Sequence, residues 1–173
     1  YDDIDPTIWS GTTAQGWFGY SVVIGDVNGD DELDVSIQNF TTTESLVKIW
    51  NLEENLLLNQ PLLTLRSSQT GSFFGKRQWI NDINNDGFDD LIVSAPFFNS
   101  DLVPEVGAVF IYSGTADISL WQSAGTNAEF LQTLIGDKAY QRLGERIWMN
   151  DIDGDNNQDL ADSDHNHNFY DFY

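Results

Sequence analysis

Three short acidic segments place oxygen-bearing side chains at alternate positions of the chain. They read DVNGDDELD from Asp26, DINNDGFDD from Asp82 and DIDGDNNQD from Asp151. Aligned on the first Asp, each has a carboxylate or amide at positions 1, 3, 5 and 9, and position 7 would contribute its backbone carbonyl. Alternating oxygens on a turning loop suit a hard cation, and Ca²⁺ takes about six to eight oxygens in irregular geometry. The three segments therefore predict about three bound calcium ions.

The candidate ligands follow from this alignment. In order of position, they are Asp26, Asn28, Asp30, Glu32 and Asp34 in the first loop, Asp82, Asn84, Asp86, Phe88 and Asp90 in the second, and Asp151, Asp153, Asp155, Asn157 and Asp159 in the third. A solvated acidic turn is the alternative interpretation, but a turn does not need alternating oxygens, and three segments in one register favour the metal. An EF-hand is excluded because position 12 lacks the bidentate Glu and the flanking sequence is strand-like.

The composition excludes several classes of function. The chain has 173 residues and a formal net charge of −21 at pH 7, which opposes binding to nucleic acid and to anionic membranes. It contains no Cys, so neither disulfides nor thiol chemistry are available. No apolar run approaches the length of a membrane-spanning helix.

The remaining polar residues give little support to catalysis, and we predict that the chain is not an enzyme. Carboxylates that hold calcium are ionised and occupied, which suits neither a general acid nor a nucleophile. His165 and His167 could bind a transition metal, but two histidines in a polar tail are more simply interpreted as solvated. Asn39 begins an Asn-Phe-Thr glycosylation triplet, which we expect in a loop just after a strand.

Each acidic loop lies within a repeat of strand-like segments. An apolar residue and a glycine precede every loop at the same distance, as Phe18-Gly19, Phe74-Gly75 and Leu143-Gly144. A short strand-like run separates this pair from the loop and another run follows the loop, so the loop is expected to join two strands of a hairpin. Two further strand-like runs follow in the first two repeats.

Four strands per repeat predict an all-β fold of antiparallel four-stranded blades of the β-propeller type. We expect one region over 1–173, with about three repeats at about 6–60, 61–128 and 129–173, the last of them incomplete. The segment PTIWSG at 6–11 has the character of a fourth strand without a blade of its own. The chain is therefore expected to be either part of a larger propeller or a subunit whose blades are completed by another copy.

The succession of Phe-Gly, strand, acidic loop and a strand ending in Ala-Pro resembles the FG-GAP repeats, which build the seven-bladed β-propeller of integrin α chains. The second repeat has every part, as FFG, DINNDGFDD and SAPFF. The first repeat has SIQNF where the Ala-Pro would fall. The third repeat has Leu-Gly in place of Phe-Gly and a polar DLADSDHNHN after its loop.

This resemblance implies a non-enzymatic, extracellular or cell-surface module that binds calcium and serves adhesion or surface structure. Its partner would be a protein or glycan at a cell surface, or further copies of itself, with no nucleic acid and no membrane insertion. Two alternatives stay open. One is a self-assembling filament subunit joined head to tail, in which PTIWSG of one copy adds a strand to the third blade of the next. The other is a carbohydrate-binding propeller.

Overall fold

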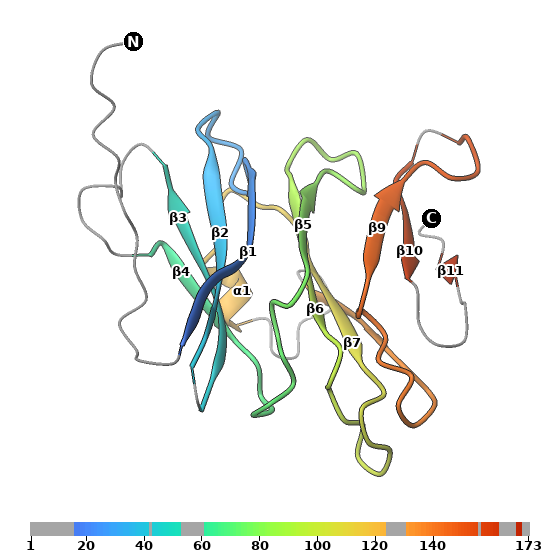
Figure 1. Ribbon diagram of the computed structural model, residues 1–173. Coiled ribbons are helices and arrows are strands. Elements are labelled where there is room, and N and C mark those ends of the chain that lie inside the picture. The colour runs from blue at the N-terminus through green and yellow to red at the C-terminus, as the bar shows by residue number, and fades with distance from the viewer. Residues whose placement is uncertain are drawn as a thin grey trace.

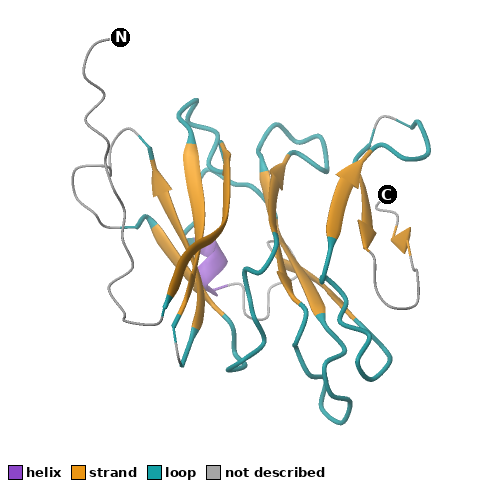
Figure 2. Cartoon of the chain, viewed as in Figure 1, coloured by secondary structure: helices purple, strands orange, loops and turns teal. Residues whose placement is uncertain are grey.

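The computed structural model describes residues 16–41, 43–52, 61–123, 131–155, 157–162 and 169–170, and these residues form three antiparallel β-sheets (Figures 1 and 2). The strand expected at 6–11 lies outside the described residues, and so do His165 and His167. The first two sheets each have four antiparallel strands in sequence order, as propeller blades do, so the predicted fold class is confirmed.

The strands follow one another through the sheets in chain order. The first sheet consists of β1 (Trp17–Gly25), β2 (Asp34–Phe40), β3 (Ser45–Asn51) and β4 (Leu63–Arg66). The second consists of β5 (Gln78–Asn81), β6 (Asp90–Ala95), β7 (Ala108–Tyr112) and β8 (Leu131–Ile135). In the third, β10 (Asp159–Asp162) lies between β9 (Ile147–Asn150) and β11 (Phe169–Tyr170). A helical turn, α1 (Leu120–Ser123), contacts β4, and no helix of the described chain is long and apolar enough to span a membrane.

The central sheet is apolar on both faces because a sheet covers it on either side. Its strand β6 is buried along its whole length. Leu91 and Val93 belong to the core shared with the first sheet, whereas Ile92 belongs to the core shared with the third. Successive side chains of a strand point to opposite faces, so one apolar strand supplies two separate cores.

The repeated spacing of an apolar residue and a glycine before each loop has a packing reason. Gly75 and Gly144 have φ of 90° and 88°, and the apolar residue before each is buried. A Cβ on Gly75 would lie 2.8 Å from Val47 of β3, and one on Gly144 would lie 2.7 Å from Ser94 of β6. Only glycine combines this backbone with so close an approach to the preceding sheet. The equivalent Gly19 has φ of 80° but no atom within 4 Å, since no described sheet precedes the first.

The outer face of the third sheet repeats a surface that is covered in the second. Trp79 of β5 and Ile83, just after that strand, pack against the core between the second and third sheets. Trp148 and Ile152 occupy the same repeat positions one sheet later, and they are 65% and 56% exposed. Within the described residues no further sheet follows the third, so this apolar face is open.

The glycosylation triplet and the first repeat boundary can be compared with the strands of the first sheet. The placement of the glycosylation triplet in a loop is wrong, because Asn39 lies within β2, opposite Phe18 of β1 and Leu46 of β3. The aromatic and β-branched residues of this strand extend its pairing into the triplet as far as Phe40. The repeat division at about 60 stays a prediction, and β4, which follows it, pairs with β3 of the first sheet.

Candidate metal centres

The three acidic segments lie at the same end of the sheets, the upper end in Figure 1. Loop 1 (26–34) runs from β1 into β2, loop 2 (82–90) from β5 into β6, and loop 3 (151–159) from β9 into β10. Each loop thus joins the first two strands of its sheet, as the sequence predicts. Position 9 is the first residue of the second strand in every case, which fixes that carboxylate to the sheet.

One hydrogen-bond pattern recurs in the loops, and loop 2 illustrates it. The Asp82 carboxylate at position 1 accepts from the backbone N–H groups of Asp86 at 3.1 Å and Gly87 at 2.9 Å. The Asn84 side chain accepts from the N–H of Asp86 at 2.9 Å, and the Asp86 carboxylate accepts from the N–H of Phe88 at 3.0 Å. Loop 1 repeats all four position-to-position bonds, and loop 3 repeats the three that do not involve position 6, which lies outside its described residues. Each loop is therefore wound around its own acidic and amide side chains.

Left-handed backbone at positions 4 and 6 makes this winding possible. Gly29 and Asp31 in loop 1 have φ of 70° and 66°, and Asn85 and Gly87 in loop 2 have φ of 59° and 91°. In loop 3, Gly154 at position 4 has φ of 85°. The sequence indicates a glycine at one position or the other. In loops 1 and 2 both positions adopt the left-handed region. Glycine occupies one of them, and the other is occupied by Asp or Asn, which tolerate this backbone best after glycine.

The carboxylate at position 9 is buried beneath each loop and accepts a hydrogen bond from the N–H of position 2, at 2.6–3.2 Å. Asp34 and Asp90 are fully buried. Burial raises the pKa of Asp34 to about 7 and that of Asp90 to about 6, and the other carboxylates of each loop add to the rise. Asp90 Oδ1 accepts from the N–H of Gly114 at 2.8 Å, whereas Asp34 Oδ1 is buried without a hydrogen-bond partner.

Loop 3 brings three of its predicted ligands together. One carboxylate oxygen each from Asp151, Asp153 and Asp159 lies within 4.8 Å of the others. In the part of the chain that the structure describes, no other three carboxylate or histidine side chains gather this closely. In loops 1 and 2 position 3 is an Asn, and its amide donates to the carboxylate at position 5, as from Asn28 to Asp30 at 2.8 Å.

The oxygen ligands that the three loops offer are of the type that a hard dication such as Ca²⁺ takes. Every candidate side chain at positions 1, 3, 5 and 9 ends in a carboxylate or amide oxygen. The buried Asp34 Oδ1 in particular needs a positively charged or hydrogen-bonding partner, because an uncompensated buried carboxylate is costly. The carbonyls of Glu32, Phe88 and Asn157 at position 7 stay predicted ligands.

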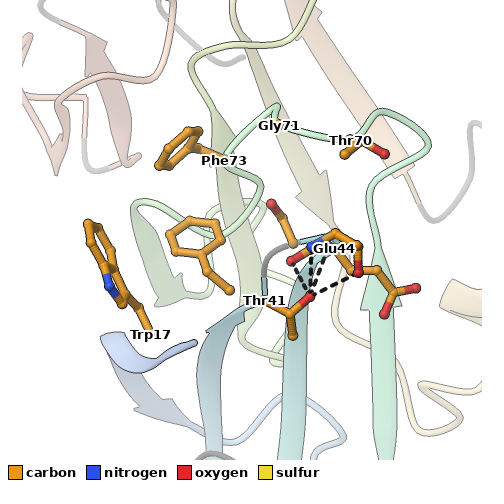
Figure 3. Close-up of a pocket in the computed structure, with 9 residues that line it drawn as sticks. Trp17, Thr41, Glu44, Thr70, Gly71 and Phe73 are labelled. Atoms are coloured by element: carbon orange, nitrogen blue, oxygen red, sulfur yellow. Dashed lines mark hydrogen bonds between the residues drawn. The ribbon is translucent and has the colours of Figure 1, made fainter. Parts of the chain in front are cut away.

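A pocket of a different character lies at the opposite end of the first sheet (Figure 3). Its cavity of about 260 Å³ has Trp17 and Phe73 on one side and Thr41 and Glu44 on the other. The Thr41 hydroxyl accepts from the backbone N–H of Glu44 at 2.9 Å, and the Glu44 carboxylate pairs with Arg66 at 2.9 Å. The pocket therefore combines exposed aromatic rings with hydroxyl groups and a carboxylate that is already paired.

Two residues outside the ligand pattern join the loops to one another. Asp89, at position 8 of loop 2, accepts a hydrogen bond from the backbone N–H of Asp26 at 2.9 Å. Asn85, at position 4 of loop 2, donates to the side-chain oxygen of Asn157 at 2.9 Å. The alternation of ligands gives no reason to select either residue. The available signal is that loop 2 alone has a carboxylate at position 8.

Comparison with known proteins identifies a repeat family in the second sheet. Residues 82–112, from the start of loop 2 to the end of β7, match the FG-GAP repeat family model. The chain therefore carries an FG-GAP repeat, and the predicted family resemblance is confirmed.

The chain is also similar to integrin α chains over most of its length. It is 29% identical to integrin alpha-IIb of Mus musculus over 171 residues, which is 93% of this chain and 15% of that protein. It is 31% identical to integrin alpha-IIb of Homo sapiens over 160 residues, 84% of this chain and 14% of that protein. Integrin alpha-8 of Gallus gallus is 30% identical over 156 residues, 84% of this chain and 13% of that protein. The chain thus spans about 15% or less of the length of these relatives.

Proposed function

We propose that the chain is a calcium-stabilised, non-enzymatic β-propeller-type module that acts outside the cell in adhesion or surface structure. The observation that carries the calcium part is the buried carboxylate of Asp34, which has an oxygen without a hydrogen-bond partner beneath a loop of acidic side chains. The same position is filled by Asp90 and Asp159 in the other two loops. Three equivalent sites would bind about three calcium ions.

Calcium would act on the stability of the hairpins rather than on any reaction. The side chains at positions 1, 3, 5 and 9 and the carbonyls at position 7 would hold it in each loop, and its charge would offset the repulsion among carboxylates. Extracellular modules bind calcium with Kd of roughly 10⁻⁴–10⁻³ M. At about 100 times Kd, one site would add on the order of 2.7 kcal/mol, which is large against a typical total stability of about 5–15 kcal/mol.

The similarity to integrin α chains supports the adhesive role and the extracellular location. The partner would be a protein or glycan at a cell surface. Three dications would offset only part of the negative charge gathered in the loops, and the opposite end of the sheets offers a more varied recognition surface. That end carries the aromatic pocket of Figure 3.

Thermal unfolding in millimolar calcium and in excess chelator tests the calcium part. We expect calcium to raise the melting temperature, and Asp153→Asn to reduce that rise because it removes one of the three grouped carboxylates of loop 3. Asp101→Asn is the matched control, since Asp101 is an exposed acidic residue outside the three loops. An equal melting temperature with calcium and with chelator would overturn the proposal.

Carbohydrate binding is a second candidate function, and the pocket favours it. Aromatic faces pack on sugar rings, and the hydroxyl groups opposite Trp17 and Phe73 can exchange hydrogen bonds with sugar hydroxyls. Because Glu44 is already paired with Arg66, the pocket suits a neutral hydroxylated ligand better than a cation. A glycan array tests this function, followed by titration of any glycan that binds into the unmodified chain and into Trp17→Ala. Trp148→Ala is the control for an exposed Trp elsewhere. Binding that both variants retain would exclude the pocket.

A further inference from the structure

Loops 1 and 2 are joined by a reciprocal pair of hydrogen bonds. The backbone N–H of Asp26 donates to the Asp89 carboxylate at 2.9 Å, and the backbone N–H of Asp89 donates to the carbonyl oxygen of Asp26 at 3.2 Å. Asp26 is the first ligand position of loop 1, and Asp89 directly precedes the buried Asp90 of loop 2. The bonds use the backbone of Asp26, so its carboxylate remains available within loop 1.

The same two loops are also in close van der Waals contact. A Cβ on Gly29 would lie 2.5 Å from the ring of Phe88, so glycine at this position lets the two loops approach. Phe88 is the residue whose carbonyl is the predicted ligand at position 7 of loop 2. A change in the backbone of loop 2 around Phe88 would therefore displace the Phe88 ring and alter its contact with Gly29 in loop 1.

The segment that follows β7 binds both loops at once. The N–H of Gly114 donates to Asp90 Oδ1 at 2.8 Å, and the N–H of the next residue, Thr115, donates to the carbonyl oxygen of Val27 at 3.1 Å. Val27 in turn donates its N–H to Asp34. The buried carboxylates of loops 1 and 2 are thus connected through three hydrogen bonds and the short backbone segments between them, at Gly114–Thr115 and at Val27.

Loops 2 and 3 are connected by side chains. The Asn85 amide donates to the Asn157 side-chain oxygen at 2.9 Å. Asn85 has φ of 59°, and it adopts this backbone as part of the turn that positions the ligands of loop 2. Asn157 is the residue whose carbonyl is the predicted ligand at position 7 of loop 3. Each end of this bond therefore belongs to a turn that a cation would order.

We propose that the three loops bind cations cooperatively, with Asp89 and Asn85 as the positioning residues that couple them; this inference rests on the proposed calcium function. A cation in loop 2 would restrict the backbone from Asn85 to Asp89, and this restriction would present Asp89 to loop 1 and Asn85 to loop 3. The neighbouring loops would then lose less conformational entropy when they bind their own cations. By linkage, the effect is the same in the reverse direction.

Electrostatic repulsion alone would give negative cooperativity between the loops. The first bound dication lowers the negative potential that attracts the second, so loops that interact only through charge would bind in steps of falling affinity. At physiological ionic strength this effect is screened beyond roughly 8 Å, whereas the hydrogen bonds and the Gly29–Phe88 contact act directly. The sign of the coupling therefore distinguishes the two mechanisms.

A calcium titration followed by ¹⁵N NMR tests the proposal at about 0.15 M salt, because the amides of Gly29, Gly87 and Gly154 report loops 1, 2 and 3 separately. We expect the three midpoints to coincide and the curves to be steeper than for independent sites. Asp89→Ala should separate the midpoint of Gly29 from that of Gly87, and Asn85→Ala should separate that of Gly154. A coupling of typical size would correspond to a shift of about 5-fold or more in midpoint.

Matched variants separate the hydrogen bonds from charge and from folding. Asp89→Asn keeps an acceptor for the N–H of Asp26 and removes the charge, so it should retain coincident midpoints. Asp101→Ala removes a carboxylate elsewhere and should also leave the midpoints unchanged. Independent curves in the unmodified chain, or unchanged curves in Asp89→Ala, would overturn the coupling while leaving calcium binding in place. The absence of any calcium-dependent shift at the three glycines would instead overturn the proposed function itself.

Discussion

The Asp34 carboxylate reaches back beneath its loop to the backbone of Val27, from which its Oδ2 accepts a hydrogen bond at 3.2 Å. Both residues are fully buried, and the second oxygen of Asp34 has no hydrogen-bond partner. One oxygen therefore closes the hairpin, and the other is left to interact with whatever the loop contains. Without a cation, this arrangement places a carboxylate in an environment that disfavours its charge.

Asp34→Asn should separate these two roles. Asn keeps an oxygen that can accept from Val27 but removes the buried charge, so we expect the chelated variant to be at least as stable as the unmodified chain. In calcium, the variant should lose part of the stabilisation, on the order of 2.7 kcal/mol if one site empties at a calcium level about 100 times Kd. Melting temperatures in calcium and in chelator measure both effects. A variant destabilised equally in both media would show that Asp34 serves the hairpin alone.

The chelated chain should become less stable as the pH rises from about 4 to about 7. Burial raises the pKa of Asp34 to about 7 and that of Asp90 to about 6, whereas the pKa of an Asp in the unfolded chain is about 3.9. Between these values the folded chain holds more protons than the unfolded chain, so each step up in pH favours unfolding. Calcium should flatten this dependence because it replaces the protons. Urea unfolding across this pH range measures the slope.

The double variant Asp34→Asn with Asp90→Asn provides the control for this pH dependence. It removes the two raised carboxyl groups, so its chelated form should lose stability less steeply over the same pH interval. An unchanged slope would assign the pH dependence to general repulsion among the acidic residues of a chain with a net charge of −21.

Gly144→Ala should destabilise the chain more than Gly19→Ala. Both glycines have left-handed φ, of 88° and 80°, which costs an Ala roughly 1–2 kcal/mol. Only at Gly144 would the new Cβ meet a neighbour, 2.7 Å from the Cβ of Ser94, and such overpacking adds about 1–3 kcal/mol. The difference in the free energy of unfolding between the two variants isolates the contact between sheets. Equal losses would mean that the glycine is needed for its backbone alone.

The repeating features of this chain could be predicted from sequence because they depend on local spacing. The alternation from Asp82 to Asp90 predicts a loop between two strands, and the structure has one there. The strands themselves follow from apolar runs such as β6. These relationships connect residues that are close in the chain, and the loop pattern occurs three times in the same alignment, so each position of the pattern is seen three times.

The contacts between repeats could not be predicted in the same way. The bond from Asp26 to Asp89 joins residues 63 positions apart, and nothing in the local pattern of either loop requires it. The placement of Asn39 was wrong for a related reason: the triplet marks the residue type, whereas the pairing of β2 with both neighbours decides that the strand extends to Phe40. Strand pairing within a sheet and contacts between sheets thus decide between local conformations that the sequence pattern alone permits equally.

We predict that the chain associates with further copies of itself through the outer faces of its first and third sheets, and that Trp148→Glu abolishes this association. Trp148 and Ile152 are 65% and 56% exposed, while their counterparts Trp79 and Ile83 pack against a neighbouring sheet. At the other end, Ile24 of β1 is 54% exposed, whereas Met149, at the same repeat position, is 7% exposed.

Two copies could therefore stack the third sheet of one on the first sheet of the other, which is a head-to-tail contact that can repeat. Sedimentation in calcium over a range of concentrations measures this association. Leu102→Glu is the matched control, because Leu102 is 95% exposed and lies in a turn between β6 and β7 of the central sheet. Association that survives Trp148→Glu would exclude the sheet face as the contact, and a monomer at every concentration would exclude self-assembly through these two faces.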